Sequence, residues 1–203
     1  MIYIISVKYE MLRILYYIKD GEKMVYTYSE CKEKYKTDYE LRKALAAGEL
    51  KKVHHGIYTD DLYESDLSII SAAYPYAVFT LNSAFYYHGL TDTIPDAYYL
   101  ITDKNATKIK DKDVIQYFDN NDSLLLGQET MQYDGASIRV FSKERMLIEL
   151  VRNRKKLPFD YYKEIIFSYR KLVYNLDIQA IQEYAASLPK TNHIMETLQL
   201  EVF

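Results

Sequence analysis

The chain has 203 residues, a hydrophobic share of 49%, a charged share of 27%, and only 6 glycines and 4 prolines. This composition excludes disordered, collagen-like and low-complexity proteins, and the length suits one large domain or two small ones. The net charge of -3 conceals an asymmetry, since residues 1–60 carry +2 and the remainder carries -5.

The sequence lacks the signals of membrane and secreted proteins. The longest apolar stretches, at 1–7 and 72–81, end well before the roughly 20 residues that a membrane helix needs. The N-terminus has neither the basic region nor the cleavage site of a signal peptide. The single cysteine, Cys31, offers no intramolecular disulfide and no zinc-finger spacing. We therefore expect a cytoplasmic protein with no membrane partner.

The first sixty residues predict three helices in succession. Apolar residues at helical spacing over 7–18 indicate an amphipathic first helix. A capping box at Thr27–Glu30 predicts the start of a short second helix, and a second box at Thr37–Glu40 predicts a third helix that stops at Gly48. The second and third helices are thus joined by a tight turn.

A hairpin is predicted after these helices. Residues 50–54 and 57–59 have the pattern of strands, and His55-Gly56 supplies the turn between them. Three helices followed by a hairpin are the arrangement of a winged helix-turn-helix, in which the third helix enters the DNA major groove and the hairpin lies on the backbone or minor groove.

Basic and aromatic residues gather on the predicted third helix and hairpin. The apolar stripe of the helix leaves Tyr39, Arg42 and Lys43 on its opposite face. An arginine fork suits guanine or phosphate, and lysines supply point charges for phosphates. We expect the whole set to converge on one DNA-binding face, although exposed hairpin residues without a role are the alternative for each one alone. The predicted contacts are Lys36, Thr37, Tyr39, Arg42, Lys43, Lys51, Lys52, His54 and His55.

Residues 61–203 have the pattern of a mixed α/β domain after a polar hinge at 60–65. Strands are predicted at 77–79, 97–102, 114–118, 129–133 and 136–141, the last two joined by a turn at Asp134-Gly135. Helices are predicted at 66–74, 80–88, 142–151, 160–173, 177–187 and 191–200. The predicted fold class is α+β, with a winged helix-turn-helix over 1–60 and an α/β domain over 61–203 that has a sheet of four or five strands and C-terminal helices.

Few residues of this second domain point to catalysis. His88 is the best candidate, but a histidine in the last turn of a helix also interacts favourably with the helix dipole. Acids such as Asp119 lie around a strand without a cation-binding pattern and are interpreted as solvated. A basic run at 152–156 is interpreted as capping a helix end, with contact to DNA phosphates as the alternative. In the predicted hairpin of the first domain, His54 and His55 make a poor metal site, because adjacent strand residues face opposite ways. We predict no catalytic residue, metal or cofactor, with an enzyme whose active site lies in the second domain as the alternative.

Three segments resemble one known family, in that family's order. Leu45–Tyr58 contains a Gly-x-Leu-x-x-Val helix exit followed by Gly-Ile-Tyr, and Ser83–Pro95 contains Ser-Ala-x-x-x-His-Gly-Leu-Thr ahead of a proline. Lys143–Leu150 is similar to the family's Glu-Arg-Thr-Leu-x-Asp-Leu helix start, from which it departs at Met146 and Glu149. These patterns are those of the AbiEi-type abortive-infection antitoxins.

The resemblance implies an antitoxin of a two-gene toxin-antitoxin pair in phage defence. Its winged helix would bind inverted repeats in double-stranded promoter DNA and repress its own operon, as a homodimer or as two monomers meeting on DNA. The partner toxin of the family is nucleotidyltransferase-like and is countered without a stable complex. The alternative is a protein-binding module whose second domain captures the toxin directly.

Overall fold

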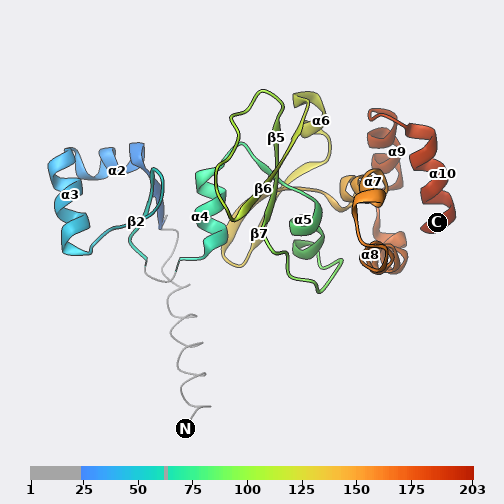
Figure 1. Cartoon of the computed structure of the whole chain (residues 1–203), viewed down its shortest axis with the longest axis horizontal. Helices are drawn as coiled ribbons and strands as arrows, with labels where there is room; N and C mark the ends of the chain where they lie inside the picture. Colours follow the sequence, from blue (N-terminus) through green and yellow to red (C-terminus); the bar gives the residue numbers. More distant parts are fainter. Residues whose placement is uncertain (1–23, 62–63) are drawn as a thin grey trace, which may run out of the picture. The chain divides into compact units, whose positions relative to one another are not determined.

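The computed structural model describes residues 24–61 and 64–203, which belong to two compact units. The first unit ends at Ala73 and the second is Tyr74–Phe203 (Figure 1). The helix predicted at 7–18 lies outside the described residues. Among those residues, none of the helices combines the length and the apolar character needed to cross a membrane.

The first unit combines short helices with a small antiparallel sheet. Its elements are β1 (Val25–Thr27), α2 (Tyr28–Tyr35), α3 (Asp38–Ala47), β2 (Lys51–His54), β3 (Ile57–Thr59) and α4 (Asp66–Ala73). The strand order is β1-β3-β2, so β3 is central and both neighbours are antiparallel to it. The sequence did not predict β1, because three residues are too few to show an alternation and their pairing partner lies thirty residues away.

Local capping signals set the helix boundaries of this unit. The Thr27 side chain accepts from the Glu30 amide while the Glu30 carboxylate accepts from the Thr27 amide, which is the predicted capping box. At the next helix the Thr37 hydroxyl accepts from the Glu40 amide, and Gly48 ends α3 in the left-handed conformation at φ 75°. These starts and stops were predicted correctly.

The core of the first unit lies between α2, α3 and one face of the sheet. It consists of Cys31, Leu41, Ala44, Leu50 and Tyr58, with Tyr26, Tyr35 and Leu45 packed against them. The only cysteine of the chain, Cys31, is fully buried, and this burial raises the pKa of its thiol.

The boundary between the units differs from the predicted one at residue 60. Helix α4, which the sequence assigned to the second domain, contacts all three strands of the first sheet. Its apolar residues Leu67 and Ile70 are buried. The predicted hinge at 60–65 therefore leads into an element of the same unit, because the apolar face of α4 is covered by that sheet.

The second unit is built on a five-stranded mixed sheet, which confirms the predicted size. The strands are β4 (Val78–Phe79), β5 (Tyr98–Asp103), β6 (Val114–Asp119), β7 (Gln128–Tyr133) and β8 (Ala136–Phe141), in the order β6-β5-β4-β8-β7. The pairs β5–β6 and β4–β8 are parallel, and the other two are antiparallel. The helices are α5 (Leu81–Tyr87), α6 (Asn121–Leu125), α7 (Lys143–Asn153), α8 (Phe159–Leu172), α9 (Ile178–Ala186) and α10 (Thr191–Glu201), with short 3-10 turns at Arg154–Lys156 and Val173–Asn175.

Helix α7 is the central element of the second unit. Every residue from Arg145 to Val151 is buried, because α5, α9 and α10 all contact this helix. In Figure 1 the helices α7 to α10, coloured orange to red, form a cluster beside the sheet. The C-terminal helices predicted from the sequence are thus the packing layer around α7.

One local expectation in this unit was wrong, and one short helix was not predicted. Thr80 precedes α5 but does not cap it, since its hydroxyl donates to the Met146 sulfur at 3.9 Å. Helix α6 was not predicted at all, because its five residues are shorter than the window in which helical periodicity can be recognised.

Candidate nucleic-acid interface

The outer face of α3 is formed as predicted. Leu41 and Ala44 are buried, which fixes how the helix is rotated about its axis, and Arg42 and Lys43 point away from the core and are exposed. Tyr39 lies on this outer face with 77% of its surface exposed. An aromatic ring beside two cations is therefore available to a ligand.

The tight turn between α2 and α3 carries two more predicted contacts. Lys36 takes a left-handed φ of 57°, and its side chain is exposed. Thr37 is exposed as well, but its hydroxyl is engaged in capping α3. Thr37 thus positions the start of α3 whether or not it meets DNA.

A carboxylate at the start of α3 is neutralised by its neighbours. The Asp38 carboxylate accepts from the Lys32 ammonium at 2.8 Å and from the Tyr28 hydroxyl at 2.9 Å. The hydrogen bond from Lys32, and then that from Tyr28, lower the pKa of Asp38. Lys32 is thereby held within the protein and offsets Asp38, one of the two acids in the first turn of α3, while the second, Glu40, is exposed.

Lys34 is also held within the protein. Its ammonium lies 3.0 Å from the Asp60 carboxylate and 4.4 Å from the centre of the Tyr26 ring. Partial burial disfavours the charge, but the hydrogen bonds to Asp60 and Tyr26 outweigh it and raise the pKa of Lys34. This pair joins α2 to the end of β3 and is a structural contact.

The remaining cations of the segment have no carboxylate partner among residues 24–61 and 64–203. They are Lys36, Arg42, Lys43, Lys51 and Lys52. The structure thus divides the seven basic residues of 32–55 into two that stabilise the fold and five that are available to a ligand.

The hairpin does not bring its cations onto one face, contrary to the expectation. In the strand register Lys52 lies opposite Tyr58, which belongs to the core under α2 and α3, so Lys52 is on the α3 side of the sheet. Lys51 lies opposite Thr59, and a register shift places His54 opposite Ile57. Lys51 and His54 are therefore on the other face, because paired residues of antiparallel strands share a side.

The turn of the hairpin is fixed against the start of α2. The Gly56 carbonyl accepts from the Tyr28 amide at 2.8 Å, and Gly56 itself has a φ of 74°. His55 is exposed in this turn, and His54 is half-buried. Within the described part of the chain, no group of three or more His, Cys, Asp or Glu side chains could hold a metal ion.

His88, the catalytic candidate of the sequence, lies in the second unit and links two elements there. Its Nε2 atom lies 2.7 Å from the Phe141 carbonyl of β8, which accepts the hydrogen bond. Burial lowers the pKa of His88 despite this bond. The alternative to catalysis that the sequence offered was an interaction with the dipole of its own helix, and the structure adds a hydrogen bond that joins the end of α5 to the sheet.

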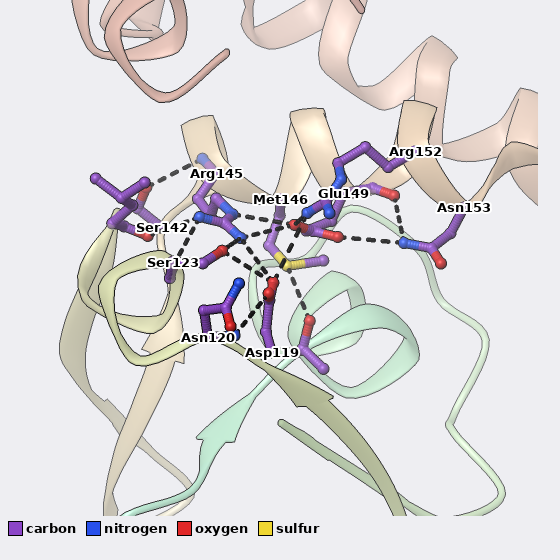
Figure 2. A network of polar contacts seen from close by, with 11 residues as sticks. Asp119, Asn120, Ser123, Ser142, Arg145, Met146, Glu149, Arg152 and Asn153 are labelled. Carbon is purple, nitrogen blue, oxygen red and sulfur yellow. Dashed lines mark hydrogen bonds and ion pairs between the residues drawn. The ribbon is translucent and has the colours of Figure 1, made fainter. Parts of the chain in front are cut away.

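A buried polar network around Arg145 was missed by the sequence analysis (Figure 2). The Arg145 guanidinium is fully buried and donates to the Glu149 carboxylate at 2.8 Å from Nη2 and 3.1 Å from Nε. It also donates to the Ser123 carbonyl at 2.9 Å, and the Asp119 carboxylate lies 3.9 Å from Nη2. Asp119 is therefore part of a buried network and not a solvated acid.

The basic run at 152–156 also has other partners than expected. The Arg152 guanidinium donates to Glu149 at 2.6 Å, and Arg154 donates to Glu201 of α10 at 2.7 Å. The only sequence signal for the network is the spacing of Arg145 and Glu149, which lie four residues apart on a helix. That spacing is common on solvated helix faces, so it did not predict burial.

Comparisons with known proteins bear on the fold alone. The comparison with protein-family models gave no match, and neither did the comparison with curated proteins. Among solved structures, the chain is similar to the crystal structure of the RV2827C protein from Mycobacterium tuberculosis, with a TM-score of 0.62 and 12% sequence identity. The similarity covers 87% of this chain and 72% of that one. The chain thus shares a mixed α+β fold with that protein.

Proposed function

We propose that the first unit binds double-stranded DNA as a winged helix-turn-helix, with α3 in the major groove and the β2–β3 hairpin beside the backbone. The observation that carries this proposal is the outer face of α3. It presents Tyr39, Arg42 and Lys43 to solvent, and neither cation has a carboxylate partner in the described chain.

In this proposal each group on the α3 side has a distinct task. Arg42 reads a base edge, because a guanidinium fork matches O6 and N7 of guanine. Lys36, Lys43 and Lys52 contact phosphates and set the register of the protein on the duplex. Tyr39 donates to a phosphate or packs on a thymine methyl group.

The biological role proposed with this activity is that of an antitoxin and transcriptional autorepressor in a toxin-antitoxin operon of phage defence. Its support is the resemblance of three sequence segments to the AbiEi-type antitoxins. The DNA site is then an inverted repeat in the promoter, which two copies of the chain occupy through two half-sites. The partner is a nucleotidyltransferase-like toxin, which is countered without a stable complex.

The test is a gel-shift titration against the chain's own upstream promoter and a scrambled duplex of equal length, at two salt concentrations. We expect tighter binding to the promoter, and weaker binding to both duplexes at the higher salt concentration. Arg42→Ala should reduce the preference for the promoter by about 1–3 kcal/mol.

Arg42→Lys is the matched variant, because it keeps the charge and loses the fork. It should retain most of the affinity for the scrambled duplex while losing the preference for the promoter. Equal binding of the native chain to both duplexes, or an Arg42→Ala variant with native preference, would contradict the proposal. Purification of a co-expressed pair should yield the antitoxin free of toxin, and a stoichiometric complex would instead favour direct capture.

A further inference from the structure

A groove on the second unit has no role in DNA binding by the first. It consists of two hollows of about 280 and 400 Å³, which adjoin because Leu81, Tyr117, Asn153 and Lys156 line both. We call them the narrow hollow and the wide hollow. The wide hollow is in the size range of small-molecule sites, and the narrow hollow is slightly below it.

The narrow hollow has an excess of positive charge. Arg152, Lys156 and Lys190 line it, together with the acids Asp119 and Glu149. Lys156 and Lys190 are exposed and have no carboxylate partner among the described residues. The hollow is therefore suited to an anion if its two acids are neutralised.

Both acids are neutralised by the buried network (Figure 2). Glu149 accepts from Arg145 and Arg152 through Oε1, and from Asn153 at 3.2 Å through Oε2. Asp119 accepts from the Ser123 hydroxyl at 2.9 Å and lies within 4.0 Å of both arginines. Arg145 thus supplies a buried positive charge, and the two lysines keep theirs for a ligand.

The wide hollow has two tyrosine rings in its lining. The rings of Tyr99 and Tyr117 are stacked there with centroids 6.3 Å apart and an angle of 20° between their planes. Ile94, Leu157 and Pro158 add apolar surface, and Asn82 and Thr93 add neutral polar groups. The Asp96 carboxylate also lines this hollow and accepts from the Tyr99 hydroxyl at 2.9 Å. A planar heteroaromatic ring with polar edges has the matching chemistry.

The backbone is strained at the narrow hollow. Of the four non-glycine residues with positive φ in the described chain, two line this hollow, namely Leu81 at 43° and Lys190 at 70°. Such conformations are unfavourable for residues with a side chain and cluster at functional sites. The backbone strain and the positive charge are independent observations, and both occur at the narrow hollow.

We propose that this groove binds a mononucleotide, with its phosphate between Arg152, Lys156 and Lys190 and its base against Tyr99 and Tyr117. A phosphate monoester carries close to two negative charges, which suits the excess positive charge of the narrow hollow. Two short adjoining hollows accommodate one nucleotide, whereas a polynucleotide needs an extended stripe of cations and stacking residues.

The experiment is a calorimetric titration of the 203-residue chain with adenosine, guanosine, cytidine and uridine monophosphates. Adenosine and inorganic phosphate are the two partial ligands. At least one mononucleotide should bind about tenfold more tightly than either partial ligand, since only a nucleotide fills both hollows.

Variants assign the two ends of the ligand. Lys156→Gln and Lys190→Gln should each weaken nucleotide binding about tenfold, because a charge-assisted hydrogen bond is lost. Lys190→Gln should leave adenosine binding unchanged, since Lys190 lines the narrow hollow and not the wide one. Tyr117→Leu should weaken the binding of both the nucleotide and adenosine. Lys108→Gln, which removes an exposed lysine that lines neither hollow, is the matched control and should bind as the native chain does.

Three outcomes would overturn the proposal. The first is that no mononucleotide binds at millimolar concentration, and the second is that inorganic phosphate binds as tightly as every nucleotide. The third is native affinity in both lysine variants. Circular dichroism spectra identical to that of the native chain would show that loss of binding in a variant is not loss of folding.

Discussion

The guanidinium of Arg145 lies in the core of the second unit, where an uncompensated charge would cost several kcal/mol. Its hydrogen bonds to Glu149 and to the carbonyls of Ser123 and Leu126 use most of its five N–H donors, and its Cζ atom lies 4.6 Å from the centre of the Phe141 ring. Burial nevertheless lowers the pKa of Arg145, although its normal value is high enough for the charge to persist.

Removing one partner of this pair should be more harmful than removing both. Glu149→Gln leaves the buried charge without its main carboxylate, and we expect the free energy of unfolding to fall by about 3–5 kcal/mol. The double variant Arg145→Met, Glu149→Leu should recover a large part of this loss, because it removes the charge itself. Urea denaturation measures both, with the exposed Glu196→Gln as control. A Glu149→Gln variant as stable as that control would contradict this account of the network.

His88 should make the stability of the second unit depend on pH. Because burial lowers its pKa in the folded chain, the unfolded chain takes up a proton first as the pH falls. Folding is therefore weakened as the pH drops below about 6.5, the ordinary pKa of histidine. The variant His88→Gln keeps a hydrogen-bond donor near Phe141 but does not titrate. Between about pH 7.5 and 5.5 its unfolding free energy should decrease less than that of the native chain, and identical decreases would exclude this role.

At the scale of whole elements, the sequence predicted whatever depends on neighbours along the chain. The caps at Thr27, Thr37 and Ser142 accept the expected amide hydrogen bonds, and Asp134-Gly135 joins β7 to β8. These signals act within four residues, so they can be recognised in the sequence without knowledge of the fold. Elements stabilised by distant partners were missed or misassigned, as β1 and α4 show.

In the candidate interface too, the sequence predicted the features that depend on local periodicity and missed those that depend on distant contacts. The outward face of α3 follows from helical periodicity, which placed Arg42 and Lys43 correctly. The capture of Lys34 by Asp60 depends on a contact across 26 residues, and no local pattern contains it. The separation of Lys52 from Lys51 and His54 on β2 requires the register, including its irregularity, which the sequence does not display.

The two faces of β2 should contribute unequally to DNA binding. Lys52 lies on the α3 side of the sheet and Lys51 on the opposite side. Lys52→Ala should therefore lower the affinity for every duplex and reduce the magnitude of the salt slope by about 1, whereas Lys51→Ala should leave both nearly unchanged. Gel-shift titrations over a series of salt concentrations measure this difference. Equal losses in the two variants would mean that the hairpin meets DNA in another orientation.

For the molecule as a whole, a net charge of -3 gives no general attraction to DNA, so binding depends on a small group of cations. Lys36, Arg42, Lys43 and Lys52 form that group on the α3 side. With one phosphate neutralised by each of the three lysines, and Arg42 on a base edge, the logarithm of the binding constant should fall with the logarithm of the salt concentration with a slope of about -3 for one chain. Two chains on an inverted repeat should double it. A slope near zero would mean that DNA is not held by these residues.

The burial of Cys31 makes its thiol a probe for opening of the core of the first unit. The chain has no other thiol, and a maleimide reagent can reach this one only when the core under α2 and α3 opens. The rate of labelling thus reports how often that core opens, without any engineered probe. Promoter DNA that binds only the closed unit should slow the labelling of Cys31 in proportion to its occupancy. A nucleotide bound to the second unit should leave the labelling rate unchanged.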